Sequence, residues 1–122
     1  METTPASILT FVPARDFEVA SAFYEAIGFE CPSHDEGVRY FGMGDVGFLL
    51  QDFWVKAWAE NFMMAMHVED AAAVIARVDA VSDRFDGVRT QAPQMEDWGM
   101  IVGYFWDPTG VLWHITQRPE SA

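Results

Sequence analysis

Two stretches of the chain show the same order of apolar and polar positions. Residues 7–13 and 62–68 are apolar runs that predict strands, and each is followed by an aspartate suited to a helix N-cap, Asp16 or Asp70. Behind each aspartate, apolar residues recur at helical spacing. These stripes are Phe17, Ala20, Phe23, Tyr24 and Ile27 in the first stretch, and Ala71, Val74, Ile75, Val78 and Val81 in the second. The aligned caps and stripes indicate two copies of one unit.

Each predicted helix is followed by three strand-like segments bounded by turn residues. These segments are residues 29–33, 37–43 and 46–52 in the first half, and 88–93, 99–106 and 111–117 in the second. The pattern predicts an α+β fold in which one domain, residues 1–122, contains two tandem βαβββ modules. The modules span about 7–52 and 62–117, and a crossover at 53–61 joins them. Paired modules would form curved sheets around a cleft that alternate strand residues line.

The charge balance narrows the classes of partner. Among 122 residues, 7 are lysine or arginine and 19 are aspartate or glutamate, which gives a net charge of -12. Such a chain repels a phosphate backbone or an anionic membrane, so we expect neither nucleic acid nor membrane as a partner. Acidic charge gathered at a cleft would favour a cationic ligand. The alternative is that the charge only keeps the protein soluble.

Other features of the composition predict a cytoplasmic protein. Hydrophobic residues make up 51% of the chain, which suffices for one core. The single Cys31 cannot form an internal disulfide and suits a reducing compartment. The N-terminus lacks a basic segment followed by an apolar stretch, and no apolar run approaches the roughly 18 to 20 residues of a membrane span.

Four short motifs resemble the vicinal oxygen chelate superfamily, whose members include glyoxalase I, extradiol dioxygenases, fosfomycin-resistance enzymes and bleomycin-resistance proteins. The motifs are ARDFEVASAFYEAIGF (14–29), VED (68–70), DWG (97–99) and DPTGVLWHITQ (107–117). The chain is most similar to the bleomycin-resistance branch, through Arg15-Asp16, Phe23-Tyr24, Gly28-Phe29 and Trp98-Gly99. This resemblance implies the glyoxalase/bleomycin-resistance fold. It also implies a metal-free homodimer that sequesters a cationic, flat-ringed antibiotic in acidic, aromatic grooves between subunits.

The resemblance also indicates where metal-dependent members hold a divalent ion. The four matching positions are Leu9, Gln51, Met63 and His114. Leu9 has no ligand atom, and the thioether of Met63 suits soft metals rather than hard divalent ions. Gln51 and His114 alone are fewer than the three protein ligands of a typical catalytic zinc site. We therefore expect no metal, no cofactor and none of the superfamily's usual catalysis.

The leading hypothesis is metal-independent binding of a small aromatic compound between the sheets of a homodimer, cationic if the acidic charge gathers at the cleft. The candidate lining residues are Trp98, Tyr40, Phe41, Gln51, Phe53, Met63 and His114. Trp98 stands beside Glu96 and Asp97, so its ring could stack on a flat cation. The alternative for Trp98 is that it closes the core or the dimer interface.

Two other classes of function stay open. One is a metal-dependent lyase or dioxygenase that uses Gln51, His114 and a third ligand such as His67. The other is a structural or regulatory partner protein whose exposed aromatics serve only to dimerise. Trp54 and Trp58 are four positions apart, so a short helix would present both at such an interface.

Overall fold

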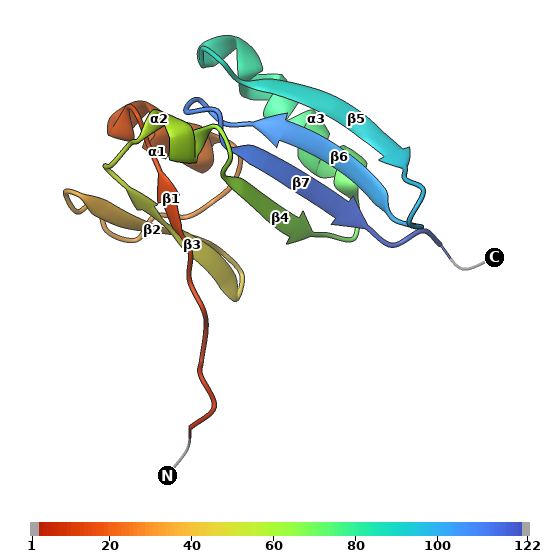
Figure 1. Cartoon of the computed structure of the whole chain (residues 1–122), viewed down its shortest axis with the longest axis horizontal. Coiled ribbons are helices and arrows are strands. Elements are labelled where there is room, and N and C mark those ends of the chain that lie inside the picture. The colour runs from red at the N-terminus through yellow and green to blue at the C-terminus, as the bar shows by residue number, and fades with distance from the viewer. Residues whose placement is uncertain (1–2, 121–122) are drawn as a thin grey trace.

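The strands of the computed structural model, which describes residues 3–120, form two sheets that follow the two halves of the chain (Figure 1). The three-stranded sheet contains β1 (Phe11–Pro13), β2 (Val38–Met43) and β3 (Val46–Gln51), in the order β1-β3-β2. The four-stranded sheet contains β4 (Met63–His67), β5 (Arg89–Met95), β6 (Ile101–Trp106) and β7 (Leu112–Gln117), in the order β4-β7-β6-β5. In both sheets the first strand is parallel to the last, and the last is antiparallel to the strand before it. The predicted α+β class is confirmed.

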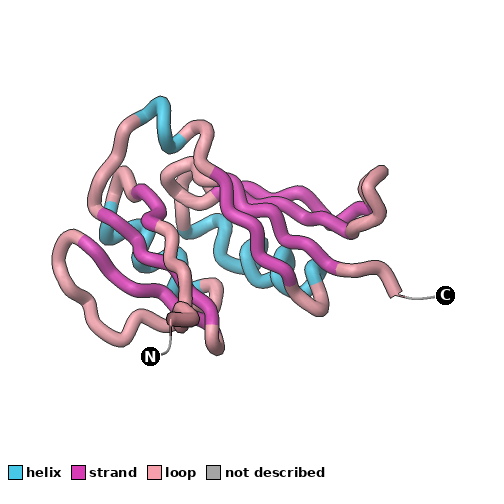
Figure 2. Tube along the Cα trace, turned by 60° about the horizontal axis from the view of Figure 1, so that its bottom comes forward, coloured by secondary structure: helices cyan, strands magenta, loops and turns pink. Residues whose placement is uncertain are grey.

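The helices begin where the aspartates predict. The helical elements are α1 (Phe17–Ala26), α2 (Lys56–Ala59), α3 (Ala71–Val81) and the 3-10 turn η1 (Ser82–Arg84). The Asp16 carboxylate accepts the Val19 N–H at 3.1 Å, and the Asp70 carboxylate accepts the Ala73 N–H at 3.0 Å. Figure 2 shows the short α2 at the crest of the connection between the sheets. Within residues 3–120, no helix has the length and apolar character that crossing a bilayer requires.

The two sheets share one core, and α1 joins them. The Tyr24 ring of α1 lies 4.9 Å from the Phe48 ring of the three-stranded sheet and 5.9 Å from the Trp113 ring of the four-stranded sheet. Trp113 in turn stacks on Phe105 at 5.6 Å. The helix α3 covers only the four-stranded sheet and lies behind it in Figure 1. On the opposite face of that sheet, residues 3–120 place no helix.

The turn at residues 107–110 is tied to α1 by a buried carboxylate. Asp107 accepts the backbone N–H groups of Thr109, Gly110 and Val111, each at 2.9 Å. Its other oxygen accepts the Tyr24 hydroxyl. Because burial disfavours the charged form, the pKa of Asp107 is raised to about 6 although all of these hydrogen bonds oppose that rise. The turn therefore connects the second half of the chain to the first helix.

Two predicted strands are shorter than the sequence pattern indicates. Residues 29–33 form only an isolated bridge between Glu30 and Gly42. Pro32 lacks a backbone N–H, so it cannot donate to the ladder that this segment would need. In the first strand, pairing begins at Phe11 rather than at residue 7. The register places Phe11 opposite Leu49, so residues 7 and 8 would lie opposite the hairpin end of β3.

Candidate small-molecule site

The face of the four-stranded sheet opposite α3, here called the open face, carries thioether, imidazole and indole side chains. Along β4, Met63, Ala65 and His67 are exposed, whereas Met64 and Met66 pack against the core. This alternation follows from the two-residue period of a strand. On the neighbouring β7, His114 is the register partner of Ala65. A thioether and two imidazoles therefore share a face that no helix within the described part of the chain covers.

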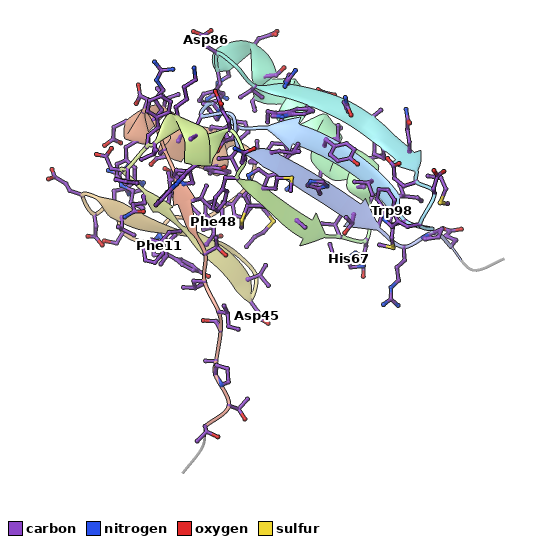
Figure 3. The ribbon with its side chains drawn as sticks, in the orientation of Figure 1. Phe11, Asp45, Phe48, His67, Asp86 and Trp98 are labelled. Carbon is purple, nitrogen blue, oxygen red and sulfur yellow. The ribbon has the colours of Figure 1, made fainter. Side chains whose placement is uncertain are left out.

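A hollow of about 400 Å³ lies on this face. Its lining residues are Met63, Met64, Ala65, Trp98, Val102, His114 and Thr116. Trp98 is 66% exposed and projects from the turn between β5 and β6. Figure 3 shows Trp98 and His67 at the same end of the four-stranded sheet. Three of the candidate lining residues, Met63, Trp98 and His114, thus surround one hollow.

His114 lies in a mixed environment at this hollow. Its Nε2 atom is 3.4 Å from the Sδ atom of Met63. The Tyr104 ring meets the imidazole edge to face, with 5.0 Å between the ring centroids. Burial and the nearby Glu96 carboxylate raise the pKa of Tyr104 above its ordinary value. The imidazole therefore borders both a thioether sulfur and an aromatic ring.

The remaining candidates lie elsewhere. Gln51 and Phe53 line a second hollow of about 330 Å³, together with Phe11, Pro13, Trp58 and Phe62. The Phe53 and Trp58 rings are 6.1 Å apart. Figure 3 places Phe11 on the three-stranded sheet, well away from Trp98 and His67. Gln51 and His114 therefore lie at two separate hollows in this chain, rather than on one pocket floor.

Tyr40 and Phe41 point to opposite sides of the three-stranded sheet. Tyr40 is 36% exposed, and its ring lies across Gly42 and Gly47, where an added Cβ would collide with it. Phe41 is fully buried and stacks on Phe48 at 5.8 Å. Consecutive strand residues face opposite sides, so only one of the two can meet a ligand. The assignment of Phe41 as a lining residue is wrong, because its side chain belongs to the core.

The residues at the superfamily's four metal positions do not fit a divalent ion. Leu9 lines a third hollow with Tyr40, Gln51 lines the second, and Met63 and His114 line the first. Across residues 3–120 there is no group of three His, Cys, Asp or Glu side chains that could hold a metal. His67 adds no ligand through Nδ1, which lies 3.0 Å from the Thr116 hydroxyl. Among the four positions, the only ligands usual for a divalent ion are one amide oxygen, of Gln51, and one imidazole, of His114.

Two features of the surface are not predictable from the pattern of residues along the chain. The Arg89 guanidinium lies 4.1 Å from the centroid of the Trp106 ring, so it covers that aromatic on the open face. The antiparallel register of β5 with β6 makes the two residues partners, and the sequence contains no signal for that pairing. A polar hollow of about 500 Å³ between α1, η1 and the 107–110 turn also went unpredicted; Asp86, labelled in Figure 3, lies at its rim. Its residues are far apart in the sequence.

Comparison with known proteins places this architecture in the class of the glyoxalase/bleomycin-resistance fold. No family model matches the chain. A bleomycin resistance protein from Klebsiella pneumoniae is 28% identical in an alignment 114 positions long that covers 88% of this chain and 88% of the other. The crystal structure of a bleomycin-binding protein complexed with bleomycin is 26% identical, with a TM-score of 0.79 over 93% of this chain and 98% of the other. A bleomycin resistance determinant encoded on the transposon Tn5 is 24% identical, with a TM-score of 0.80 over the same shares. The predicted resemblance to the superfamily and to its bleomycin-resistance branch is confirmed.

Proposed function

We propose that this protein sequesters a small aromatic molecule on the open face of the four-stranded sheet, without a metal held by the protein. One observation carries the proposal: the exposed Trp98 stands at the hollow that Met63 and His114 also line. An indole ring, a thioether and an imidazole offer an adaptable, flat surface to an aromatic ligand. The relative that has been solved with bleomycin supports this class of function.

The ligand we favour is cationic. Glu96 and Asp97 precede Trp98 in the turn, and the whole chain carries a net charge of -12. A cation above the indole face would gain both the attraction of the ring quadrupole and that of the two carboxylates. The same charge argues against nucleic acid as a partner. The free Cys31 accords with action in the cytoplasm, which is part of the proposal.

A homodimer completes the proposed site. Large hydrophobic side chains stay exposed on both halves of the monomer, including Phe11 at 52%, Trp58 at 67% and Met63 at 60%. The segment before β1 extends away from the rest of the chain in Figure 1, and its Ile8 is 89% exposed. Apolar surface of this kind is typical of an interaction site. A second copy could bring the Gln51 hollow of one subunit to the His114 hollow of its partner.

Calorimetric titration with bleomycin tests the ligand proposal. Replacing Trp98→Ala removes the stacking surface, so we expect binding to weaken about tenfold, within the range of a cation–π contact of up to about 2 kcal/mol. Met95→Ala is the matched control, because Met95 is 58% exposed at the same turn but does not line the hollow. Equal affinities of the two variants would contradict the role of Trp98. No binding of any cationic aromatic, with an intact dimer, would instead favour a protein that uses its aromatics only to associate.

A further inference from the structure

The side chains of Met63 and His114 meet across two neighbouring strands. Met63 is the register partner of Leu112, two positions before His114 on β7, so the two residues are diagonal neighbours on the open face. The distance between Met63 Sδ and His114 Nε2 is 3.4 Å. No other described residue hydrogen-bonds to this imidazole, and Met63 is 60% exposed. Both donor atoms are therefore available to a small species that enters from solvent.

The spacing of these two atoms suits an ion that binds both. Zinc binds imidazole nitrogen at about 2.0 Å and cysteine sulfur at about 2.3 Å, and bonds of similar length would keep the two donors of a shared ion between about 3 Å when bent and about 4.3 Å when linear. The observed separation lies within that interval. Met63 is unbranched and exposed, so its sulfur can move to the best position without disturbing the core. A two-coordinate soft ion favours a linear arrangement, so the Met63 sulfur would move about 0.9 Å away from the imidazole to form both bonds.

The donor chemistry selects the kind of ion. Of the residues that line this hollow, none has a carboxylate or a thiol. A hard divalent ion such as Mg²⁺ or Ca²⁺ would find no oxygen anion here, and zinc would lack its usual three protein ligands. A thioether paired with an imidazole is a donor set for soft ions, of which Cu(I) is the biological example. The acidic surface of the chain adds a general attraction for cations.

We propose that Met63 Sδ and His114 Nε2 form a two-ligand site for a soft monovalent metal ion, Cu(I) in the cell. The site replaces the superfamily's hard divalent centre: it uses two of the four family positions, with donors that the divalent chemistry does not use. It is separate from the proposed sequestration of an aromatic molecule, which needs no ion, although both occupy one hollow. A bound ion would therefore compete with the aromatic ligand.

Silver(I) titration of the whole chain, followed through the methionine methyl groups by NMR, tests this site. Silver(I) is the redox-inert equivalent of Cu(I), and a Cys31→Ser background removes the one thiol that would bind it. We expect the Met63 methyl signal to shift with one equivalent of silver. The signal of the exposed Met95 should not shift at that stoichiometry, which makes it an internal control. Zinc at the same concentration should move neither signal.

Two substitutions distinguish silver binding at this site from nonspecific silver binding at other methionine side chains. Met63→Leu keeps the shape of an exposed apolar side chain and removes the sulfur, and His114→Gln removes the imidazole. Each should weaken silver binding at least tenfold, whereas Met95→Leu and His67→Gln should leave it unchanged. Unchanged silver affinity in Met63→Leu or His114→Gln, with circular dichroism showing a folded chain, would overturn the proposal. Trp98→Ala keeps both donor atoms and removes the stacking ring, so it should weaken bleomycin binding and leave silver binding unchanged, and either proposal can fail alone.

Discussion

The two sheets have the same strand connections but use their outer faces differently. On the outer face of the three-stranded sheet, the Tyr40 ring of the edge strand β2 lies across Gly42 and Gly47. On the four-stranded sheet, Met63 and His114 stay open beside the exposed Trp98. Inward-facing strand residues are largely apolar in both sheets, although β2 also buries Arg39. The comparison teaches that the core positions maintain the shared topology, while the alternate positions on the same strands are free to acquire different chemistry.

The two long helices, α1 and α3, also differ in how they pack inside the molecule. The helix α1 inserts Phe23 and Tyr24 between the sheets, and Tyr24 contacts rings from both. The helix α3 buries Ile75 and Val78 against one sheet only. Large rings can span two layers, whereas compact aliphatic side chains let a helix lie close to a single sheet. One repeated pattern thus has a joining helix in the first half and a covering helix in the second.

The largest expected effect concerns Asp107, the buried carboxylate that links the 107–110 turn to α1. Asp107 has its pKa raised from 3.8 to about 6, so between these values the folded chain binds a proton that the unfolded chain has released. Its contribution to stability is therefore fully present below about pH 4 and is lost as the pH rises through about 6. Relative to Asp107→Asn, the free energy of unfolding of the natural chain should fall by about 3 kcal/mol across this interval.

Urea denaturation at a series of pH values measures this difference. Comparison with Asp107→Asn cancels the pH dependence that comes from carboxylates present in both chains. Glu18 is one of them: its hydrogen bond to Arg39 lowers the pKa of Glu18, which gives the opposite slope. A difference that stays constant from pH 4 to 6.5 would show that burial does not control the protonation of Asp107.

The next effect concerns the close approach of α3 to its sheet. A Cβ added at Gly103 would lie 2.9 Å from Cγ1 of Ile75 and 3.1 Å from Cγ of Pro93. Gly103→Ala should therefore lower the free energy of unfolding by about 2 kcal/mol, because the helix must move away from β6 or distort its packing. Thermal or urea unfolding gives the value.

A second substitution identifies the cause. Ile75→Ala removes Cγ1 and Cδ1, which lie 2.9 Å and 3.3 Å from the added Cβ, so the double variant should lose less stability than the two single losses combined. Gly42 offers the comparison on the other sheet, where the colliding group is the partly exposed Tyr40 ring. Simple additivity of Gly103→Ala and Ile75→Ala would show that the helix does not control this position.

Local signals in the sequence predicted the elements well. The helix starts were predictable because Asp16 and Asp70 bond to backbone groups only three residues away. The turn at 107–110 was likewise evident from its own residues. The segment 29–33 was harder, because its apolar character predicts a strand while Pro32 and the lack of an extended partner limit it to one bridge at Glu30.

The site was only partly predictable, because it depends on how distant strands are placed. Met63, Trp98 and His114 meet at one hollow as their family positions suggest. Gln51 does not join them, since the positions of two sheets relative to each other follow from core packing far from either residue. Phe41 was misplaced for a simpler reason: only the strand register shows which of two adjacent aromatics faces outward.

The smallest expected effect tests whether the repeated helix caps are equivalent. Asp16→Ala and Asp70→Ala each remove one acceptor from an exposed helix start, and each should cost about 1 kcal/mol of unfolding free energy. Asn at either position keeps the acceptor and should restore most of the loss. Urea unfolding of the two alanine variants and the double variant provides the comparison.

The surroundings of the two caps differ in one respect that can separate them. In α3, the Gln117 side chain from β7 accepts the Ala71 N–H at 2.7 Å, so a second residue holds the start of that helix. Gln117→Ala should therefore increase the cost of Asp70→Ala and leave that of Asp16→Ala unchanged. If Gln117→Ala instead changes both costs equally, the support from β7 acts on the whole fold, and the two helix starts are equivalent in energy as well as in sequence.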